Sequence, residues 1–497
     1  MNSNEKVLVI AGLDSSSGAG LVSDCITIRD FGCYPLNCVT TLTAQSFDRI
    51  DMAKSVDFEM FKNTLDVLVS DNKDIKSLKI SLVSDLRFID YLIEKLSTDL
   101  KDVKVVYDPV LKGTKGSLNS ANIKSVLTKF LPYVDIFTPN LEEASYLSGI
   151  DIHFDDDIKK ASSYFRSLGT KAVIIKGGHS NDGEYCSDYF LSDEFSFVLR
   201  QRRTSKLGVH GGGCALSSAL ASLLAKNFAM HDAAVIANAY TTKGVREPEL
   251  SLDKLTRAPF GHHGLNLELN DMPDVFQSDF PRSKESFAPC PLKMGLYPVV
   301  DSYEWIERLV NLGVKTIQLR IKDKNRDDLY MQIQKSVELC RQKKVRLFID
   351  DHYELAIKAG AFGVHLGMED LLKADVEKIR KSGLRLGVST HGAYETLKAV
   401  SLKPSYIALG HIFETQSKKM PSKPQGVYKL DLLMRILKSA YSTVAIGGIK
   451  LDNVKSVVQT GVGSVALITG ITKADDVEST VKQWLEICSD GGESSWK

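Results

Sequence analysis

Two aspartates in the second half of the chain stand where a magnesium ion could bind. Asp351 and Asp370 each follow a short apolar run that is typical of a strand. Each of them could instead cap the helix that comes next, since aspartate is a good N-cap residue. The two together favour a cation site, because carboxylate oxygens are ligands that suit Mg²⁺.

Donors that suit phosphate follow a neighbouring predicted strand. Gln318, Arg320 and Lys322 in the run QLRIKD offer amide, guanidinium and ammonium groups. A later loop that could close over an anion supplies hydroxyls and a positive charge from Thr415, Ser417 and Lys418. The alternative for the lysine is plain solvated surface charge. Carboxylates beside such donors suggest Mg²⁺ that bridges the protein and a pyrophosphate group.

A run of glycines in the first half predicts an anion-binding helix start. Gly211 to Gly213 lead directly into the apolar pattern CALSSALASLLA, so free backbone N–H groups lie at the positive end of a helix. Cys214 is in the first turn, where we expect the helix dipole to favour its thiolate. The alternative is a tightly packed glycine turn with a buried and inert cysteine.

Further polar residues in the first half follow predicted strands. Asp108 comes after VKVVY, Asn140 and Glu143 lie in PNLEE, and Lys176 opens KGGH. These groups should meet at the carboxyl ends of parallel strands, where ligands bind in open α/β sheets. The run Gly18-x-Gly20-x-x-Ser23 is a near match to a dinucleotide fingerprint, but the next strand lacks the acidic residue that would hold a ribose, so we expect no nicotinamide site.

The elements that must position these residues alternate between strands and helices. Short runs rich in Val and Ile recur throughout, each followed by a turn and a helical pattern, which predicts an α/β protein with mainly parallel sheets. Eight such runs follow residue 293 and predict a (β/α)₈ barrel with its active site at the carboxyl strand ends. That rule brings to one mouth Asp351, Asp370, Ser389, Gly448 and Thr469.

We expect two folded domains and a connection between them. Residues 1–257 form an open α/β sheet domain, 258–293 a linker, and 294–490 the barrel. The linker contains prolines at 259, 273, 281, 289 and 291 and shows little periodicity, so we expect it to be mostly exposed. The alternative is that Leu265 to Leu269 form an edge strand or extend a helix.

The composition excludes several classes of protein. Among 497 residues, 63 Lys and Arg balance 62 Asp and Glu, which disfavours a nucleic-acid partner. No apolar stretch approaches the ~18 residues of a membrane span. Eight cysteines without a C-x-x-C pair indicate neither zinc nor disulfides. We therefore expect a soluble, unprocessed cytoplasmic protein without a nucleic-acid or membrane partner. We also expect small-molecule substrates and a homo-oligomer, neither of which rests on the composition.

The second half resembles thiamine phosphate synthase over residues 294 to about 487, in the motifs GLYPVVDS, QLRIKD, FIDDHYELAIKAGAFGVHLGMEDL, LRLGVSTH, TVAIGGI and TGVGSVALIT. The resemblance implies that a hydroxymethylpyrimidine diphosphate is joined to thiazole phosphate with release of pyrophosphate. It implies that Asp351 and Asp370 hold Mg²⁺ and that Ser389 lies near the pyrimidine. It implies diphosphate binding by Gln318, Arg320, Lys322 and the catalytic Lys418. Thiazole phosphate or pyrophosphate would be bound by Thr415, Ser417, Gly448 and Thr469.

The first half resembles the hydroxymethylpyrimidine and phosphomethylpyrimidine kinases of the ribokinase-like fold over residues 5 to 257, in AGLDSSSGAG, DPVLK, TPNLEEA, KGGH and HGGGCALSSALA. The resemblance implies two successive phosphoryl transfers from Mg-ATP. It implies that the pyrimidine is bound by Gly12, Asp24 and Gln45. It implies metal binding by Asp108 and Glu143 and nucleotide binding by Asn140 and Lys176. Gly211, Gly213 and Cys214 would be catalytic, as the anion hole and the group facing the acceptor hydroxyl.

This chain departs from both families at a few positions. Asp350 stands where asparagine is common and would place another negative charge beside the diphosphate, as a substrate-binding residue that could also point at Mg²⁺. Gly212 replaces the usual threonine of HGTGC, and Ser81 replaces a glycine. These changes leave open an alternative in which the synthase is active while the first half is a weakened kinase, a pyrimidine-binding module or a regulatory module.

Overall fold

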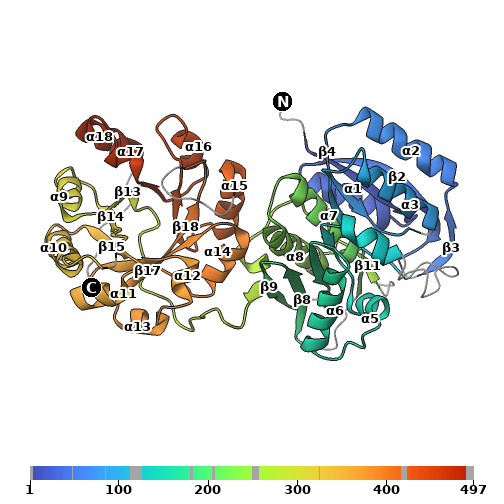
Figure 1. Cartoon of the computed structure of the whole chain (residues 1–497), viewed down its shortest axis with the longest axis horizontal. Helices are drawn as coiled ribbons and strands as arrows, with labels where there is room; N and C mark the ends of the chain where they lie inside the picture. Colours follow the sequence, from blue (N-terminus) through green and yellow to red (C-terminus); the bar gives the residue numbers. More distant parts are fainter. Residues whose placement is uncertain are drawn as a thin grey trace. The chain divides into compact units, whose positions relative to one another are not determined.

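The computed structural model describes residues 4–47, 49–83, 85–111, 126–178, 183–203, 208–248, 257–323, 325–415 and 423–488 (Figure 1). The chain divides into two compact units, Met1–Gln277 and Ser278–Lys497. Among the described helices, none combines the length and the apolar character that crossing a bilayer requires. Ser417 and Lys418 lie outside the described residues.

The first unit is built on a ten-stranded sheet. In sheet order the strands are β12 (Asp274–Phe276), β9 (Ser196–Arg202), β8 (Tyr185–Ser192), β7 (Ala172–Ile175), β6 (Ile136–Phe137), β5 (Lys104–Tyr107), β4 (Ile75–Ile80), β1 (Lys6–Leu13), β2 (Tyr34–Gln45) and β3 (Ile50–Ser55). The strands from β7 to β2 in this order are parallel, and the strands outside them pair antiparallel. The predicted open α/β sheet is therefore confirmed.

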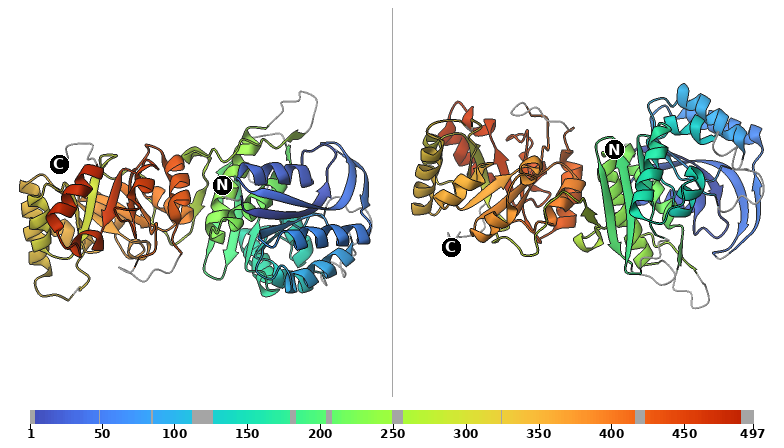
Figure 2. Two further views of the ribbon diagram at one scale, coloured as in Figure 1. Left: turned by 90° about the horizontal axis from the view of Figure 1, so that it is seen from above. Right: turned by 60° about the horizontal axis from the view of Figure 1, so that its bottom comes forward.

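Helices cover both faces of this sheet (Figure 2). One face packs against α2 (Phe58–Asp71), α3 (Leu86–Ser97), α5 (Leu141–Ser148) and α6 (Asp155–Ser167), whose apolar residues form one core with Leu8, Ile10 and Leu78. Alternate strand residues point the other way, since side chains change face at every step. On that face Ser77 bonds the backbone of α7 (Gly212–Ala225), which is joined by α1 (Gly20–Asp30) and α8 (Met230–Arg246).

The second unit is a closed barrel of parallel strands. They are β13 (Gly295–Val300), β14 (Thr316–Leu319), β15 (Arg346–Asp350), β16 (Gly363–Leu366), β17 (Arg385–Thr390), β18 (Tyr406–Gly410), β19 (Ser442–Ile446) and β20 (Ser464–Leu467). The predicted eight-stranded barrel is thereby confirmed. Its interior is filled by side chains that include Tyr297, Phe348, Tyr406, Val444 and Ala466, as this fold requires.

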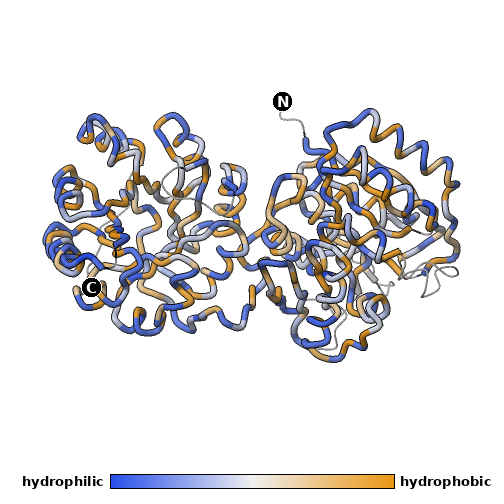
Figure 3. The backbone as a smooth tube through the Cα atoms, viewed as in Figure 1, coloured by the Kyte–Doolittle hydropathy of each residue, from blue (hydrophilic) through white to orange (hydrophobic). Residues whose placement is uncertain are grey.

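The helices around the barrel alternate between apolar and polar residues, while its strands are largely apolar (Figure 3). This pattern is typical of helices that bury one apolar stripe along their length. The described helices around the barrel are α9 (Tyr303–Asn311), α10 (Leu329–Gln342), α11 (Tyr353–Ala359), α12 (Met368–Leu371), α13 (Val376–Lys381), α14 (Ala393–Val400), α15 (Gly426–Leu437), α16 (Val454–Val458), α17 (Thr469–Thr472) and α18 (Val477–Ile487).

The segment 258–293 differs from the exposed linker that we expected. Its first part contributes to the first unit: β11 (Arg257–Pro259) pairs with β10 (Gly208–His210), a short 3₁₀ turn spans Leu269–Asp271, and β12 extends the sheet. Leu265 to Leu269 do not form the edge strand considered above, because β12 takes that place.

The rest of this segment covers the amino-terminal end of the barrel. Arg385, the first residue of β17, donates to the Pro289 carbonyl, and Ser442, the first residue of β19, donates to the Cys290 carbonyl. Phe280 and Phe287 are buried. Apolar residues between the prolines therefore have cores to pack against, which periodicity alone does not reveal. The domain boundaries at 257, 294 and 490 stay predictions.

Two glycine-containing loops meet at the start of α7. Gly211 is the N-cap residue, with φ of 100° in the left-handed region, which favours glycine. A methyl group on Gly211 would overlap the Gly18 carbonyl oxygen. Gly212 is different, because a methyl group there would meet Val245 and Thr241 at 3.7 and 3.9 Å, which is ordinary van der Waals contact.

These neighbouring glycines should respond oppositely to alanine. Gly212→Ala should stabilise the first unit by about 0.5 kcal/mol, because it restricts the unfolded chain without native strain. Gly211→Ala should destabilise it by about 2 kcal/mol or more through strain and overlap. Calorimetric unfolding of the full chain measures both against the transition of the second unit as internal control. A wild-type melting temperature for Gly211→Ala would contradict the assigned packing.

Candidate functional site

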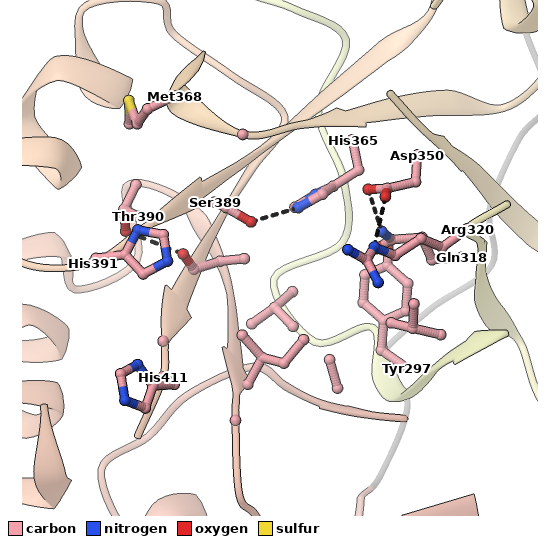
Figure 4. Close-up of a pocket in the computed structure, with 18 of the residues that line it drawn as sticks. Tyr297, Gln318, Arg320, Asp350, His365, Met368, Ser389, Thr390, His391 and His411 are labelled. Atoms are coloured by element: carbon pink, nitrogen blue, oxygen red, sulfur yellow. Dashed lines mark hydrogen bonds and ion pairs between the residues drawn. The ribbon is translucent and has the colours of Figure 1, made fainter. Parts of the chain in front are cut away.

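A cavity of about 500 Å³ opens where the barrel strands end (Figure 4). Its wall brings together most of the residues that we expected at this mouth: Gln318, Arg320, Asp350, Asp351, Asp370, Ser389 and Thr415. Lys322, Gly448 and Thr469 are not part of the lining, although Gly447 and Ile468 beside two of them are. Lys322 is exposed on the loop that follows β14, and Thr469 is exposed at the first position of α17.

Asp351 and Asp370 do not cap helices. The N-cap positions of α11 and α12 belong to His352 and Gly367, and Asp370 lies inside α12. The backbone of Asp351 is left-handed, with φ of 61°, a conformation in which aspartate is among the more frequent residues. Its N–H donates to the His365 carbonyl of the neighbouring strand end at 3.0 Å. Both carboxylates thus belong to the cavity wall, and the capping alternative is wrong.

Asp350 is turned toward two of the predicted diphosphate ligands. Its carboxylate accepts from Gln318 Nε2 at 2.7 Å and pairs with Arg320 Nε at 2.9 Å (Figure 4). Burial raises the pKa of Asp350 to about 7, and the charges of Asp351 and Asp370 raise it further while Arg320 opposes them. The three carboxylates are therefore close enough to repel one another. The Asp350 carboxylate is thus engaged with Gln318 and Arg320.

The donor chemistry at this mouth fits a hard cation. Asp351 follows β15 and Asp370 lies in α12, and both line the cavity. Their carboxylates suit Mg²⁺, which binds oxygen ligands and often one or two carboxylates. In the described part of the chain no group of three His, Cys, Asp or Glu side chains forms a metal cage. A cation here would consequently need oxygens from a substrate or water to complete its coordination.

In the first unit, an ion pair lies beside the glycine helix start. Lys176 Nζ pairs with Asp108 Oδ1 at 2.6 Å, and Ser217 in α7 donates to the other Asp108 oxygen at 3.3 Å. A methyl group on Gly213 would lie 3.4 Å from Lys176 Nζ. Burial would lower the pKa of Lys176, but Asp108 and Glu143 keep it raised, so the ammonium stays charged.

Asn140 and Glu143 join the same cluster through the start of α5. Asn140 Oδ1 accepts from the Glu143 backbone at 2.9 Å, and Glu143 Oε2 accepts from the Asn140 backbone at 2.8 Å, which is a capping box. Burial raises the pKa of Glu143 to about 6, against the effect of Lys176. Asn140 also bridges to Lys176 in β pairing. The structure therefore gathers Asp108, Asn140, Glu143, Lys176 and Gly213 as expected.

Cys214 does not carry the thiolate that we predicted. Burial raises the pKa of its thiol to about 11, and the lowering effect of Lys79 is opposed by Asp24 and Asp108. The prediction was wrong because it considered the helix dipole without the desolvation of the first turn. A hydrogen bond from the Gly20 backbone favours the thiolate only weakly. Cys214 is consequently a neutral S–H group at neutral pH.

Asp24 also differs from expectation. Its carboxylate pairs with Lys79 Nζ at 2.6 Å, both side chains are 0% exposed, and Ser218 in α7 donates to it at 2.8 Å. Asp24 therefore lies beneath the start of α7, where it contacts no open surface. Sequence reasoning missed Lys79, and the signal for it was a lysine between Leu78 and Ile80, two buried apolar residues of β4.

Gln45 and Gly12 lie at the loops that meet α7. Gln45 Nε2 is 3.1 Å from His210 Nε2, and His210 is 2.9 Å from Asp14 Oδ2. Burial would raise the pKa of Asp14, but hydrogen bonds from His210 and Ser16 hold it lower. The Gly12 carbonyl oxygen lies so close to Gly20 that a side chain on residue 20 would overlap it. Asp14 and His210, which sequence reasoning did not single out, join the two loops.

Comparison with known proteins gives two separate matches. The family model for phosphomethylpyrimidine kinase matches residues 14–256, and the model for thiamine monophosphate synthase matches residues 296–471. The thiamine-phosphate synthase of Photorhabdus laumondii is 57% identical over 201 residues, which cover 40% of this chain and 92% of that protein. The enzyme of Proteus mirabilis is 54% identical over 205 residues, covering 41% of this chain and 95% of that protein.

The first unit is similar to a solved kinase. The structure of pyridoxal kinase from Staphylococcus aureus with AMP-PCP and pyridoxal superimposes with a TM-score of 0.50 and 25% identity, over 55% of this chain and 98% of that one. The ribokinase-like prediction for this unit is thereby confirmed. The chain belongs to the thiamine-phosphate synthase family, and its first half carries the match to phosphomethylpyrimidine kinase.

Proposed function

We propose that the chain is a bifunctional enzyme of thiamine biosynthesis. The first unit phosphorylates hydroxymethylpyrimidine and then its monophosphate with ATP. The barrel joins the resulting diphosphate to thiazole phosphate and releases pyrophosphate. The observation that carries the proposal is the barrel mouth, where paired carboxylates and the donors Gln318 and Arg320 line one cavity in a chain of this family.

In the barrel, positioning and electrostatics supply the rate. If the bond to the diphosphate breaks first, the aminopyrimidine carries the positive charge and the protein must neutralise the leaving group. Arg320 and Lys322 would do so, and Mg²⁺ bound by Asp351 and Asp370 would add charge neutralisation at the departing oxygens. The cavity would hold the thiazole nitrogen against the reacting carbon.

In the first unit, the helix start and the cluster beside it would hold phosphate. Backbone N–H groups at Gly211 and Gly213 suit the charge that develops on a transferring phosphoryl group, and Lys176 suits the nucleotide. Asp108 and Glu143 would hold Mg²⁺ with its waters. The neutral Cys214 is adequate near the acceptor hydroxyl, because loose phosphoryl-transfer transition states make little demand on a base.

A single reaction mixture tests the whole proposal. The purified chain receives hydroxymethylpyrimidine, thiazole phosphate and Mg-ATP, and mass spectrometry follows monophosphate, diphosphate and thiamine phosphate. All three should appear in that order. Omission of ATP and addition of pyrimidine diphosphate should give thiamine phosphate directly.

One observation favours the alternative of a weakened or regulatory first half. Position 212 has no side chain, although the space beside Val245 and Thr241 would accept one. Under that alternative the mixture would yield product only from supplied diphosphate, while the pyrimidine would still bind.

Removing either candidate metal ligand should abolish coupling alone. Asp351→Ala and Asp370→Ala should each lower the coupling rate by about 100-fold or more, because charge neutralisation of the leaving group is lost. The two assays, with supplied diphosphate and with pyrimidine plus ATP, measure the units separately. Glu354→Ala, which removes an exposed carboxylate of α11, is the control. Loss of phosphorylation in the Asp variants would contradict separate sites.

Cys214→Ala should damage phosphorylation and leave coupling intact. We expect a loss of about tenfold in the kinase rate, because the group beside the acceptor hydroxyl is removed. A thiol with a pKa of about 11 stays protonated from pH 6 to 9, so Cys214 should add no rising limb to the pH profile in that range. Cys25→Ala on α1 serves as control. An unchanged kinase rate would make Cys214 purely structural.

Asp350→Asn should hold the KM for the pyrimidine diphosphate within about threefold of wild type, or lower it. The change removes a negative charge beside the substrate and keeps one acceptor for Gln318, at the expense of the Arg320 ion pair. Steady-state coupling kinetics with supplied diphosphate provide the measurement. A severe loss, matched by a steep rise in the Mg²⁺ requirement, would instead indicate a direct metal contact.

A further inference from the structure

Four hydrogen-bonded side chains cross the interior of the barrel. Tyr297 Oη lies 2.7 Å from Tyr406 Oη, Tyr406 Oη lies 2.7 Å from His365 Nδ1, and His365 Nε2 lies 2.7 Å from Ser389 Oγ. They come from the strands β13, β18, β16 and β17. Figure 4 shows the last of these bonds at the cavity wall. We call this set the polar row.

The exposure of the side chains increases along the polar row from the tyrosines to the serine. Tyr297 and Tyr406 are 1% and 0% exposed, and His365 is 7% exposed. Ser389 is half-buried and lines the cavity. Tyr297, Tyr406 and His365 also border the cavity, but their side chains are almost fully covered, so Ser389 is the most accessible group of the row.

The packing around the polar row leaves room for the Tyr406 side chain. A methyl group on Gly387 in β17 would overlap the ring and the hydroxyl of Tyr406. The His365 and Tyr406 rings are stacked with an interplanar angle of 18°. A residue larger than glycine at position 387 would displace the Tyr406 hydroxyl, so its place opposite His365 is fixed by the strand beside it.

Counting donors fixes the direction of the hydrogen bonds. In the described residues Tyr297 Oη has Tyr406 as its hydrogen-bond partner and no second one. If Tyr406 donated to Tyr297, the Tyr297 proton would be buried without an acceptor, which is costly. Tyr297 therefore donates to Tyr406, and Tyr406 donates to His365 Nδ1.

This direction determines the state of the histidine and of the serine. With Nδ1 accepting, a neutral imidazole carries its proton on Nε2 and donates it to Ser389 Oγ. Burial, together with the charge of Arg320, lowers the pKa of His365 to about 3, which agrees with a neutral ring. The Ser389 oxygen then accepts from His365, so its own proton is left to point into the cavity.

We propose that Tyr406 and His365 are positioning residues that make Ser389 a hydrogen-bond donor to a ring nitrogen of the substrate. The inference rests on the proposed function, because it takes the pyrimidine as the aromatic heterocycle at Ser389. A ring nitrogen of an aminopyrimidine is an acceptor, and a serine oriented in this way selects it over a ring that presents an N–H or C–H at that place.

Kinetics of coupling with supplied diphosphate test the direction. Tyr406→Phe should raise the KM for the pyrimidine diphosphate by roughly threefold to tenfold, because the Ser389 donor is no longer fixed, and should leave the KM for thiazole phosphate unchanged. Tyr297→Phe is the matched control: it also deletes one buried hydroxyl, but Tyr406 still donates to His365. We expect a change below about twofold there.

A second comparison separates positioning from general packing. In a Ser389→Ala background, Tyr406→Phe should cause no further rise in KM, because the serine through which it acts is gone. An equal rise in both backgrounds, or equal effects of Tyr297→Phe and Tyr406→Phe, would overturn the proposal.

Nitrogen NMR of the ligand-free full chain tests the same point without catalysis. In ¹⁵N-histidine-labelled wild-type protein, the His365 signals, identified by their loss in His365→Asn, should show the Nε2–H tautomer. An Nδ1–H tautomer or a protonated ring would overturn the proposal. If the chain makes no thiamine phosphate, the proposed function fails, yet the tautomer still decides the direction of the polar row.

Discussion

Parallel strands force polar chemistry to one edge. Along a strand the backbone is paired and the side chains are packed, so unpaired N–H groups and polar side chains gather in the loops that follow each strand and at the helix starts beyond them. Asp108, Asn140 and Lys176 in the first unit and Asp351 in the barrel lie at such positions, and Ser389 is the second-to-last residue of β17. The open sheet and the closed sheet thus gather polar groups at one edge for the same reason, although their topologies differ.

Charge compensation is the second condition that both units satisfy. Buried carboxylates face cations: Asp24 pairs with Lys79, Asp108 with Lys176, and Asp350 with Arg320. Leaving one partner alone in such a pair costs several kcal/mol. Under the proposed function, a phosphate that enters either site would compete with a carboxylate for the cation. Under the same proposal, Asp350 would hold Gln318 and Arg320 in place until the diphosphate binds.

Much of this arrangement could be predicted from the sequence, because apolar runs mark strands and the residue after each run falls at a known edge. Asp351, Asp370 and Ser389 in the barrel and Asp108, Asn140 and Lys176 in the first unit followed from that rule. The rule failed for properties that depend on contacts between segments distant in the sequence. The Cys214 thiol depends on burial and on Asp24 and Asp108 from distant segments. Asp24 faces Lys79 because α1 packs on β1, the strand beside β4. The proline-rich segment folds because partners for its apolar residues exist elsewhere.

The polar row illustrates why such features escape a reading of the chain. No spacing connects Tyr297, His365 and Tyr406, which are brought together only by barrel closure. A buried hydroxyl or imidazole is costly unless each donor finds an acceptor, so four polar groups in an apolar barrel must be mutually consistent. Their consistency leaves a single unfilled donor, on Ser389, which is the most exposed of the four. One requirement, that each buried donor has an acceptor, therefore links Gly387, the packing of Tyr406 and the orientation of the Ser389 hydroxyl.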